Sequence, residues 1–203
     1  MIQDIEFGYD ADQLQSHLLD YLTEHGLSQS CRALEYASHK HRGQLRKEGI
    51  PYIIHPMTMA CHALAVGLED DTILSVILLH DVCEDCDVAP ASLPFSETIR
   101  TGVRYLTYVR QPMEDKAEAH TRYYQAMRAC PQACLVKLFD RCHNVSSMAK
   151  AFSDEKIRRY IRETKDYVYP LIEYTKECCP EYRRIIFLLE YQIKSLIHAC
   201  ERI

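Results

Sequence analysis

The sequence predicts an all-α protein, and three observations support this. Only 6 Gly and 8 Pro occur in 203 residues, so few positions interrupt a helix. Apolar residues recur mostly at helical spacing, and the alternating Val, Ile and Thr runs typical of strands are few. The apolar fraction of 47% with 26% charged residues is that of an ordinary globular protein with a proper core. We therefore expect a helical bundle that forms a single domain over 1–203.

The N-terminal part of that domain, 1–26, predicts an amphipathic helix over 11–25. Its apolar side carries Leu14, Leu18, Leu19 and Leu22. Gly26 is expected to end this helix. Ser28 or Ser30 is then suited to cap a second helix that runs to about Lys40.

The stretch HKHRGQLRKEGIPYIIHP, residues 39–56, predicts a loop, and it is the most basic part of an acidic chain. Gly43, Gly49 and Pro51 disfavour a helix. The positive charges are those of Lys40, Arg42, Arg46 and Lys47. The net charge of −5 argues against nucleic acid as a partner, but a basic loop suits a small anionic ligand. A solvated charged surface is the alternative.

Two further helices follow this loop. Pro56 suits the first position of a helix over 56–66, and this places His55 at the entrance of that helix. Asp70 or Asp71 is expected to cap the next helix, which begins as a nearly continuous apolar run and is therefore expected to be buried.

The apolar run ends abruptly in an imidazole and three carboxylates: His80, Asp81, Glu84 and Asp85. On one continuous helix these side chains fall within an arc of about 140°. Like charges so close repel each other, and the negative end of the helix dipole adds to the repulsion. A cation among them would remove most of that cost. A solvated acidic helix end is the alternative, and we favour a metal site.

The second half of the chain predicts helices over about 95–109, 114–129, 132–150, 154–178 and 181–201. The last of these, within 172–203, is expected to complete the core. Pro170 is expected to kink or break the helix over 154–178. Asp140 lies in the mostly apolar helix over 132–150, where an ionised carboxylate must be paired, hydrogen-bonded or metal-bound. A salt bridge to Lys137 or Arg141 is the alternative to a metal, and Asn144 lies one turn beyond Asp140.

Four residues far apart in the chain together offer two imidazoles and two carboxylates: His55, His80, Asp81 and Asp140. Such a set of N and O donors suits a divalent ion of the manganese, iron or zinc kind. A water whose pKa is lowered by such an ion is a nucleophile at neutral pH. Glu84 and Asp85 are placed to orient that water or to move its proton. The chemistry predicted is metal-assisted hydrolysis of a phosphoester held by the basic loop.

Three segments also resemble a known family: RKEGIPYIIHP, LLHDVCED and KLFDRCHN. Their order, H…HD…D, is similar to the signature of HD-domain phosphohydrolases. The residues that flank this signature in the three segments resemble those of the hydrolase domain of Rel/SpoT proteins and of the stand-alone small alarmone hydrolases. The resemblance covers about residues 30–150, and RETKDYVYPL extends it more weakly to 171.

The resemblance implies an HD-domain helical bundle with a metal site at its centre. It implies manganese-dependent hydrolysis of guanosine 3′,5′-bis(diphosphate), or of its pentaphosphate relative, with release of pyrophosphate from the 3′ position. The sequence departs from the family pattern at some positions, such as Cys86 after the acidic pair Glu84 and Asp85. These departures leave open which purine nucleotide is preferred. An HD phosphohydrolase for an adenosine alarmone or NADPH therefore remains an alternative, as does a non-catalytic module that binds an alarmone.

Carried over residue by residue, the resemblance implies a role for each matched position. The metal ligands would be His55, His80, Asp81 and Asp140, and the catalytic pair would be Glu84 and Asp85. Arg46 would stack on the purine, a sensible use of a planar guanidinium. Lys47 would lie near the phosphates, Asn144 near the ribose, and Tyr160 would contact the substrate.

The 10 cysteines form no convincing disulfide framework, and we expect reduced thiols. Cys83 and Cys86 are expected to be ordinary helix-end residues, with a thiol redox role as the alternative. The first residues show neither the basic nor the apolar region of a secretory signal, so a cytoplasmic location is expected. No apolar run is long enough to predict a transmembrane helix, so no membrane partner is expected.

Overall fold

A computed structural model describes residues 10–47 and 49–201. Over these residues the chain forms helices, turns and loops, with one isolated bridge between Leu45 and Pro51, which confirms the all-α prediction. The structure divides into two compact units, with the boundary between Thr107 and Tyr108. The expected single domain over 1–203 stays a prediction, and its residues 1–9, 48 and 202–203 lie outside the described part.

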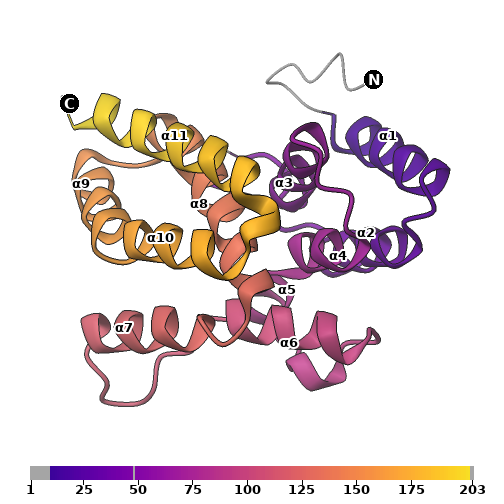
Figure 1. Ribbon diagram of the computed structural model, residues 1–203. Helices are drawn as coiled ribbons and strands as arrows, with labels where there is room; N and C mark the ends of the chain where they lie inside the picture. The colour runs from indigo at the N-terminus through magenta and orange to yellow at the C-terminus, as the bar shows by residue number, and fades with distance from the viewer. Residues whose placement is uncertain (1–9, 48, 202–203) are drawn as a thin grey trace. The chain divides into compact units, whose positions relative to one another are not determined.

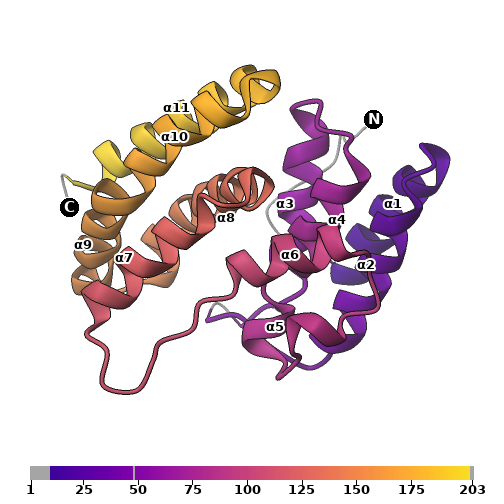
Figure 2. The same ribbon diagram turned by 60° about the horizontal axis from the view of Figure 1, so that its bottom comes forward.

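The first unit is built around one buried helix. Its elements are α1 (Ala11–Glu24), α2 (Ser28–Lys40), α3 (Ile54–Ala65), α4 (Asp71–Leu79), α5 (Val82–Asp85), the 3₁₀ turn η1 (Pro90–Ser92) and α6 (Glu97–Leu106) (Figure 1). Helix α4 is buried along residues 73–79, and α2, α3 and α6 pack against it (Figure 2). The apolar run that predicts a buried helix is therefore the centre of this unit.

The N-terminus of α2 is capped from another helix. The carboxylate of Asp71 accepts hydrogen bonds from the backbone N–H groups of Gln29 (3.0 Å) and Ser30 (2.8 Å), and from the Ser30 hydroxyl (2.7 Å). The prediction that Ser28 or Ser30 caps this helix is wrong, because a carboxylate brought in from α4 satisfies these orphan N–H groups. Asp70 caps α4 itself, which confirms one of the two predicted caps.

Helix α6 approaches α4 closely at a glycine. A Cβ atom added to Gly102 would lie 2.7 Å from Cγ2 of Val76 on α4. Because real Cβ atoms do not come this near, a side chain at 102 would force Val76 or the backbone of the two helices to shift.

The acidic stretch after α4 does not continue as one helix. Helix α4 ends at Leu79, and α5 begins at Val82. Between them Asp81 has φ −96° and ψ −8°, in the bridge region of backbone conformation. Nδ1 of His80 hydrogen-bonds the carbonyl oxygen of Ile77 at 2.8 Å, so this side chain engages the backbone of the last turn. The expectation that the four polar side chains share the face of one continuous helix is therefore wrong.

The second unit is arranged around a long helix. Its elements are α7 (Lys116–Met127), α8 (Pro131–Ala151), α9 (Asp154–Glu163), the π-helical turn η2 (Thr164–Val168), α10 (Tyr169–Cys178), the 3₁₀ turn η3 (Pro180–Tyr182) and α11 (Arg183–Cys200) (Figure 1). Helices α7, α10 and α11 pack against α8, whose first residue is a proline, as the missing N–H of that residue allows. The break predicted at Pro170 is present as the π-helical turn just before it.

A buried cation ties the elements of the second unit together. The Arg141 guanidinium is fully buried and donates to Glu163 (2.5 Å), to the Tyr124 hydroxyl (2.9 Å) and to the Thr164 hydroxyl (3.1 Å). Burial by itself raises the pKa of the Glu163 carboxyl, but Arg141 outweighs it and holds that pKa below its ordinary value. Buried charges persist when they are paired and hydrogen-bonded in this way.

Among the described residues, none of the helices combines the length and the apolar character that a membrane span requires.

Candidate metal centre

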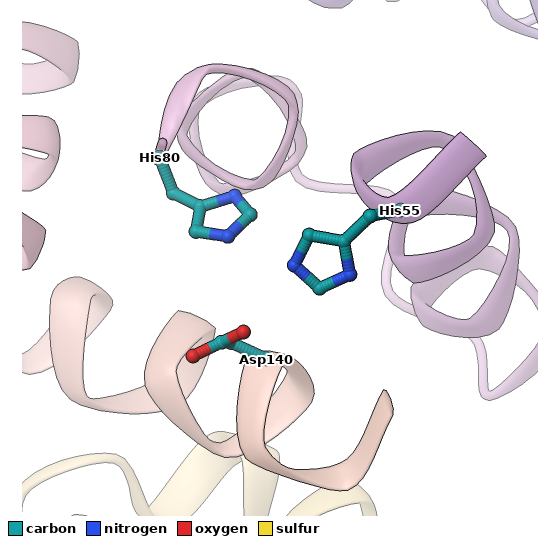
Figure 3. Close-up of side chains that lie close together, drawn as sticks. All are labelled: His55, His80 and Asp140. Atoms are coloured by element: carbon teal, nitrogen blue, oxygen red, sulfur yellow. The ribbon is translucent and has the colours of Figure 1, made fainter. Parts of the chain in front are cut away.

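Two buried imidazoles face each other in the first unit. His55 is the second residue of α3, and His80 directly follows α4. The two residues are 2% and 3% exposed, and their ring centroids lie 5.1 Å apart (Figure 3). Because α3 packs against α4, residues that are 25 positions apart in the chain reach one place.

The backbone sets which nitrogen of His80 can bind a metal. The carbonyl oxygen of Ile77 can only accept, so the hydrogen on the His80 side of this bond belongs to Nδ1. In the neutral ring the lone pair then lies on Nε2. Metal-binding histidines commonly use this arrangement, in which one ring nitrogen bonds a backbone carbonyl and the other takes the ion.

Asp81 presents one oxygen to both histidines. Its Oδ2 lies 3.0 Å from Nε2 of His80 and 3.6 Å from Nε2 of His55. A carboxylate oxygen and a ring lone pair at this separation repel each other unless a proton or a cation lies between them. These donor atoms are those that a divalent ion binds, so the arrangement fits a metal.

Asp140 is a buried carboxylate of the second unit, 5% exposed and in the middle of α8. Lys137 lies 2.7 Å from its Oδ2, and the Asn144 amide donates to its Oδ1. The salt bridge that the sequence offered as the alternative to a metal is therefore present with Lys137, whereas Arg141 pairs with Glu163. A carboxylate has about four lone-pair sites, so these partners do not exhaust its capacity to accept.

Three buried side chains can each supply one donor atom to a metal ion: His55 and His80 in the first unit and Asp140 in the second (Figure 3). The Asp81 side chain is 22% exposed, more than the two histidines of its unit. The set contains only N and O donors, which suits manganese, iron or zinc and not a structural thiolate site.

The predicted catalytic pair lies on the short helix that Asp81 begins. Glu84 and Asp85 are both exposed on α5, within one turn of Asp81. The backbone of Asp85 is held from the basic loop, because the Gln44 amide donates to its carbonyl oxygen at 3.1 Å. Exposed carboxylates here can reach a ligand that approaches from solvent.

Arg46 and Lys47 lie in a tight turn of the loop that leads into α3. The N–H of Arg46 donates to the carbonyl of Ile50 (2.8 Å), and the N–H of Gly49 donates to the carbonyl of Arg46 (2.9 Å). Gly49 has φ +80°, a conformation that favours glycine. Arg46 is half-buried and Lys47 is exposed. The structure thus brings both cations into the unit that holds the two histidines.

The other two predicted substrate residues lie in the second unit. Asn144 bonds Asp140 from one turn further along α8. The Tyr160 ring lies over the Arg141 guanidinium, 4.0 Å from it, and packs edge-on against Phe152. Each of these two side chains therefore has a partner that fixes it within its own unit.

Tyr52 is a residue of this region that the sequence reasoning missed. Its hydroxyl donates to Oδ2 of Asp81 at 2.6 Å. Burial, followed by the negative charge of Asp81, raises the pKa of the Tyr52 phenol above its ordinary value, so the hydroxyl remains a donor. The signal available in the sequence was a tyrosine three residues before His55 in the segment PYIIHP.

The two cysteines of the same region lie at the short helix as expected. Cys83 is on α5 and Cys86 directly follows it. Burial raises the pKa of the Cys83 thiol to about 11, so this group is protonated at neutral pH. Sγ of Cys86 lies 3.5 Å from Nδ1 of His41.

Comparisons with known proteins identify the family of this chain. A family model described as "HD domain" matches residues 33–172, the range that contains every site residue discussed above. A guanosine-3′,5′-bis(diphosphate) 3′-pyrophosphohydrolase of Aquifex aeolicus is 32% identical over 166 residues, covering 80% of this chain and 23% of that protein. The protein of the same name from Vibrio cholerae is 35% identical over 170 residues, covering 80% of this chain and 24% of that protein.

A solved structure is also similar. It is described as a metazoan ortholog of SpoT that hydrolyzes ppGpp, and it superposes with a TM-score of 0.67 at 22% identity. The match covers 84% of this chain and 94% of that one. At this identity the likeness shows the fold, which agrees with the expected helical bundle. The chain spans about a quarter of the length of the two curated relatives.

Proposed function

Because the chain belongs to the HD domain family, we propose that it is a metal-dependent hydrolase of guanosine 3′,5′-bis(diphosphate), ppGpp, or of the corresponding pentaphosphate. Water would cleave the 3′ phosphoester so that ppGpp yields GDP and pyrophosphate. The relatives from Aquifex and Vibrio carry the name of this reaction. The substrate is a small nucleotide, and the expected location is the cytoplasm.

The observation that carries this proposal is the convergence of His55, His80 and Asp81 within the first unit. The carboxylate oxygen Oδ2 of Asp81 lies 3.0 Å from Nε2 of His80 and 3.6 Å from Nε2 of His55. The Nδ1 proton of His80 is directed to a backbone carbonyl. Such an arrangement requires a proton or a cation between the donor atoms, because lone pairs and negative charge otherwise face each other in a largely buried place.

The proposed ligands are His55, His80, Asp81 and Asp140, and the proposed ion is Mn²⁺. Asp140 would join the three residues of the first unit from α8. An ion held there would polarise a phosphoryl oxygen and lower the pKa of a bound water. Mn²⁺ accepts mixed imidazole and carboxylate ligands, and Fe²⁺ or Zn²⁺ would suit the same donors.

Glu84 and Asp85 are the proposed catalytic residues. They are exposed carboxylates within one turn of Asp81. Either one would take a proton from the attacking water and pass it to the leaving 3′ oxygen, which is the work of a general base and acid.

The substrate would be held by residues from both units. Arg46 is proposed to stack on the guanine and Lys47 to pair with a phosphate, since both lie in the loop that leads to His55. Asn144 is proposed to bond the ribose, and Tyr160 to contact the substrate from α9.

The decisive assay incubates the manganese-supplemented protein with ppGpp, with the adenosine analogue of ppGpp and with NADPH in parallel. Ion-exchange chromatography separates the products. We expect GDP and pyrophosphate from ppGpp, and no release after EDTA treatment. The control is His17→Ala, because His17 is exposed on α1 and this variant should retain full activity.

Each other result has a definite meaning. Faster hydrolysis of the adenosine nucleotide or of NADPH would keep the hydrolase class and overturn the guanosine preference. Binding of ppGpp without turnover would identify a non-catalytic module. A folded protein that stays inert and binds none of the nucleotides would overturn the proposal as a whole.

A further inference from the structure

The Tyr52 hydroxyl bonds the one carboxylate oxygen that faces both histidines. It donates to Oδ2 of Asp81 at 2.6 Å, and the same oxygen lies 3.0 Å from Nε2 of His80. The phenol therefore bonds the same oxygen that we assign to the ion.

The Tyr52 ring is itself held in place. It stacks on the imidazole of His41, with centroids 4.7 Å apart and planes 24° apart, and it meets the ring of His55 edge-on. His41 is buried, and its Nδ1 bonds the Gln44 side chain at 2.7 Å. A ring restrained on two sides offers a hydroxyl whose position is fixed, so little rotational freedom remains to be lost when it makes its bond.

Asp81 needs such a partner more than the histidines do. It lies between two helices, and its side chain is 22% exposed. An aspartate at such a place can rotate toward solvent and remove its oxygen from the site. The two imidazoles, in contrast, are buried and packed.

We propose that Tyr52 is a positioning residue of the metal site, whose hydroxyl fixes the carboxylate of Asp81 with Oδ2 directed at the histidine nitrogens. The inference rests on the proposed function, since it assumes that His55, His80 and Asp81 hold an ion. Tyr52 belongs neither to the H…HD…D signature nor to the buried group of donors His55, His80 and Asp140. Partners of this kind orient metal ligands and change metal affinity about 10–100-fold when they are removed.

The test removes only the hydroxyl. Tyr52→Phe keeps the ring that stacks on His41, and isothermal titration calorimetry of the metal-free protein with Mn²⁺ gives the dissociation constant without any turnover. We expect that constant to rise about 10- to 100-fold. In assays with ppGpp, raising the manganese concentration should restore much of the lost kcat, while KM for the nucleotide should change little.

Tyr21→Phe is the matched control. The Tyr21 hydroxyl also donates to a carboxylate, that of Glu69 at 2.9 Å, and its ring also stacks on a histidine, His25, at 3.9 Å. It lies in the same unit, away from the site. This variant should bind Mn²⁺ as the unmodified protein does, and thermal unfolding of both metal-free variants reports any general loss of stability.

A double-variant comparison shows whether Tyr52 acts through Asp81. If it does, Tyr52→Phe combined with Asp81→Ala should bind Mn²⁺ no more weakly than Asp81→Ala alone, because the carboxylate that accepts the hydroxyl bond is then absent. Additive losses would mean that Tyr52 acts by another route, and they would overturn the proposal.

The failure of this inference differs from the failure of the proposed function. If the unmodified protein binds Mn²⁺ and Tyr52→Phe binds it within about twofold of that affinity, the positioning role is wrong and the hydrolase proposal is unaffected. If the unmodified protein itself binds no Mn²⁺, both are overturned together.

Discussion

At the scale of single residues, the proposed metal ligands and the proposed proton-transfer residues differ in burial. The imidazoles of His55 and His80 are buried, whereas Glu84 and Asp85 on α5 are exposed. Ligands of an ion need fixed positions, and groups that transfer protons need access to water and substrate. The exposure of the acidic pair therefore suits the roles that the family resemblance implies for it.

Replacing Glu84 by Gln should separate metal binding from chemistry. The amide cannot take up a proton, so kcat should fall about 100- to 10,000-fold while the affinity for Mn²⁺ stays the same. Steady-state kinetics and calorimetry measure the two quantities. Glu35→Gln, an exposed glutamate on α2, is the control and should leave both unchanged. A Glu84→Gln protein of full activity would remove Glu84 from the mechanism.

Replacing Arg46 by Ala should act on substrate binding. A guanidinium that stacks on the purine contributes equally before and during the reaction, so its loss should raise KM for ppGpp about tenfold with a modest change in kcat. Arg104→Ala on α6 removes an exposed arginine elsewhere in the same unit and is the control. An unchanged KM in Arg46→Ala would contradict the stacking role.

At the scale of elements, the helices were predictable and several of their ends were not. Periodicity located α1, α8 and α11 because their apolar positions repeat over long segments. The cap of α2 escaped prediction because Asp71 reaches it from 41 residues away, and local patterns carry no such information. The break between α4 and α5 escaped because no glycine or proline marks it in the stretch ILSVILLHDVCEDC.

The contact between α4 and α6 gives a prediction on stability. Gly102→Ala should lower the free energy of unfolding by about 1–3 kcal/mol, because its Cβ would overlap with Val76. Urea denaturation measures the change. In a protein that already carries Val76→Ala, the same Gly102→Ala substitution should cost much less, since space has been made for it. Equal costs in both backgrounds would show that the close approach of the helices is not the cause.

At the scale of the whole molecule, three separate sequence segments in a fixed order predicted the family, and the family match over residues 33–172 agrees with that prediction. The candidate metal donors could be predicted from the sequence because each of them lies in one of these segments. It could not supply Tyr52, whose role depends on its distance from Asp81 after folding. It also could not show that Lys137 pairs with Asp140, although it offered that pair as an alternative.

The stability of the molecule should depend on pH through the buried pair of Arg141 and Glu163. Because the pKa of Glu163 is lowered in the folded state, its contribution is present above the unfolded value of about 4.3 and is lost as pH falls through the folded value. Glu163→Gln should therefore lower the free energy of unfolding by about 2 kcal/mol at pH 7. The difference between variant and unmodified protein should shrink as the solution is acidified below about pH 4. A difference that is constant with pH would contradict the ion pair.

The proposed metal site depends most on Asp140, which is proposed to join the two histidines and Asp81 around an ion. The direct measurement is a calorimetric titration of the metal-free protein with Mn²⁺, carried out on the unmodified chain and on Asp140→Asn. The amide keeps the size of the side chain and can still bond Asn144, so the fold should survive, as thermal unfolding checks. We predict that the unmodified protein binds the ion and that Asp140→Asn loses at least about 100-fold in affinity. Equal affinity in the two proteins would contradict this role of Asp140.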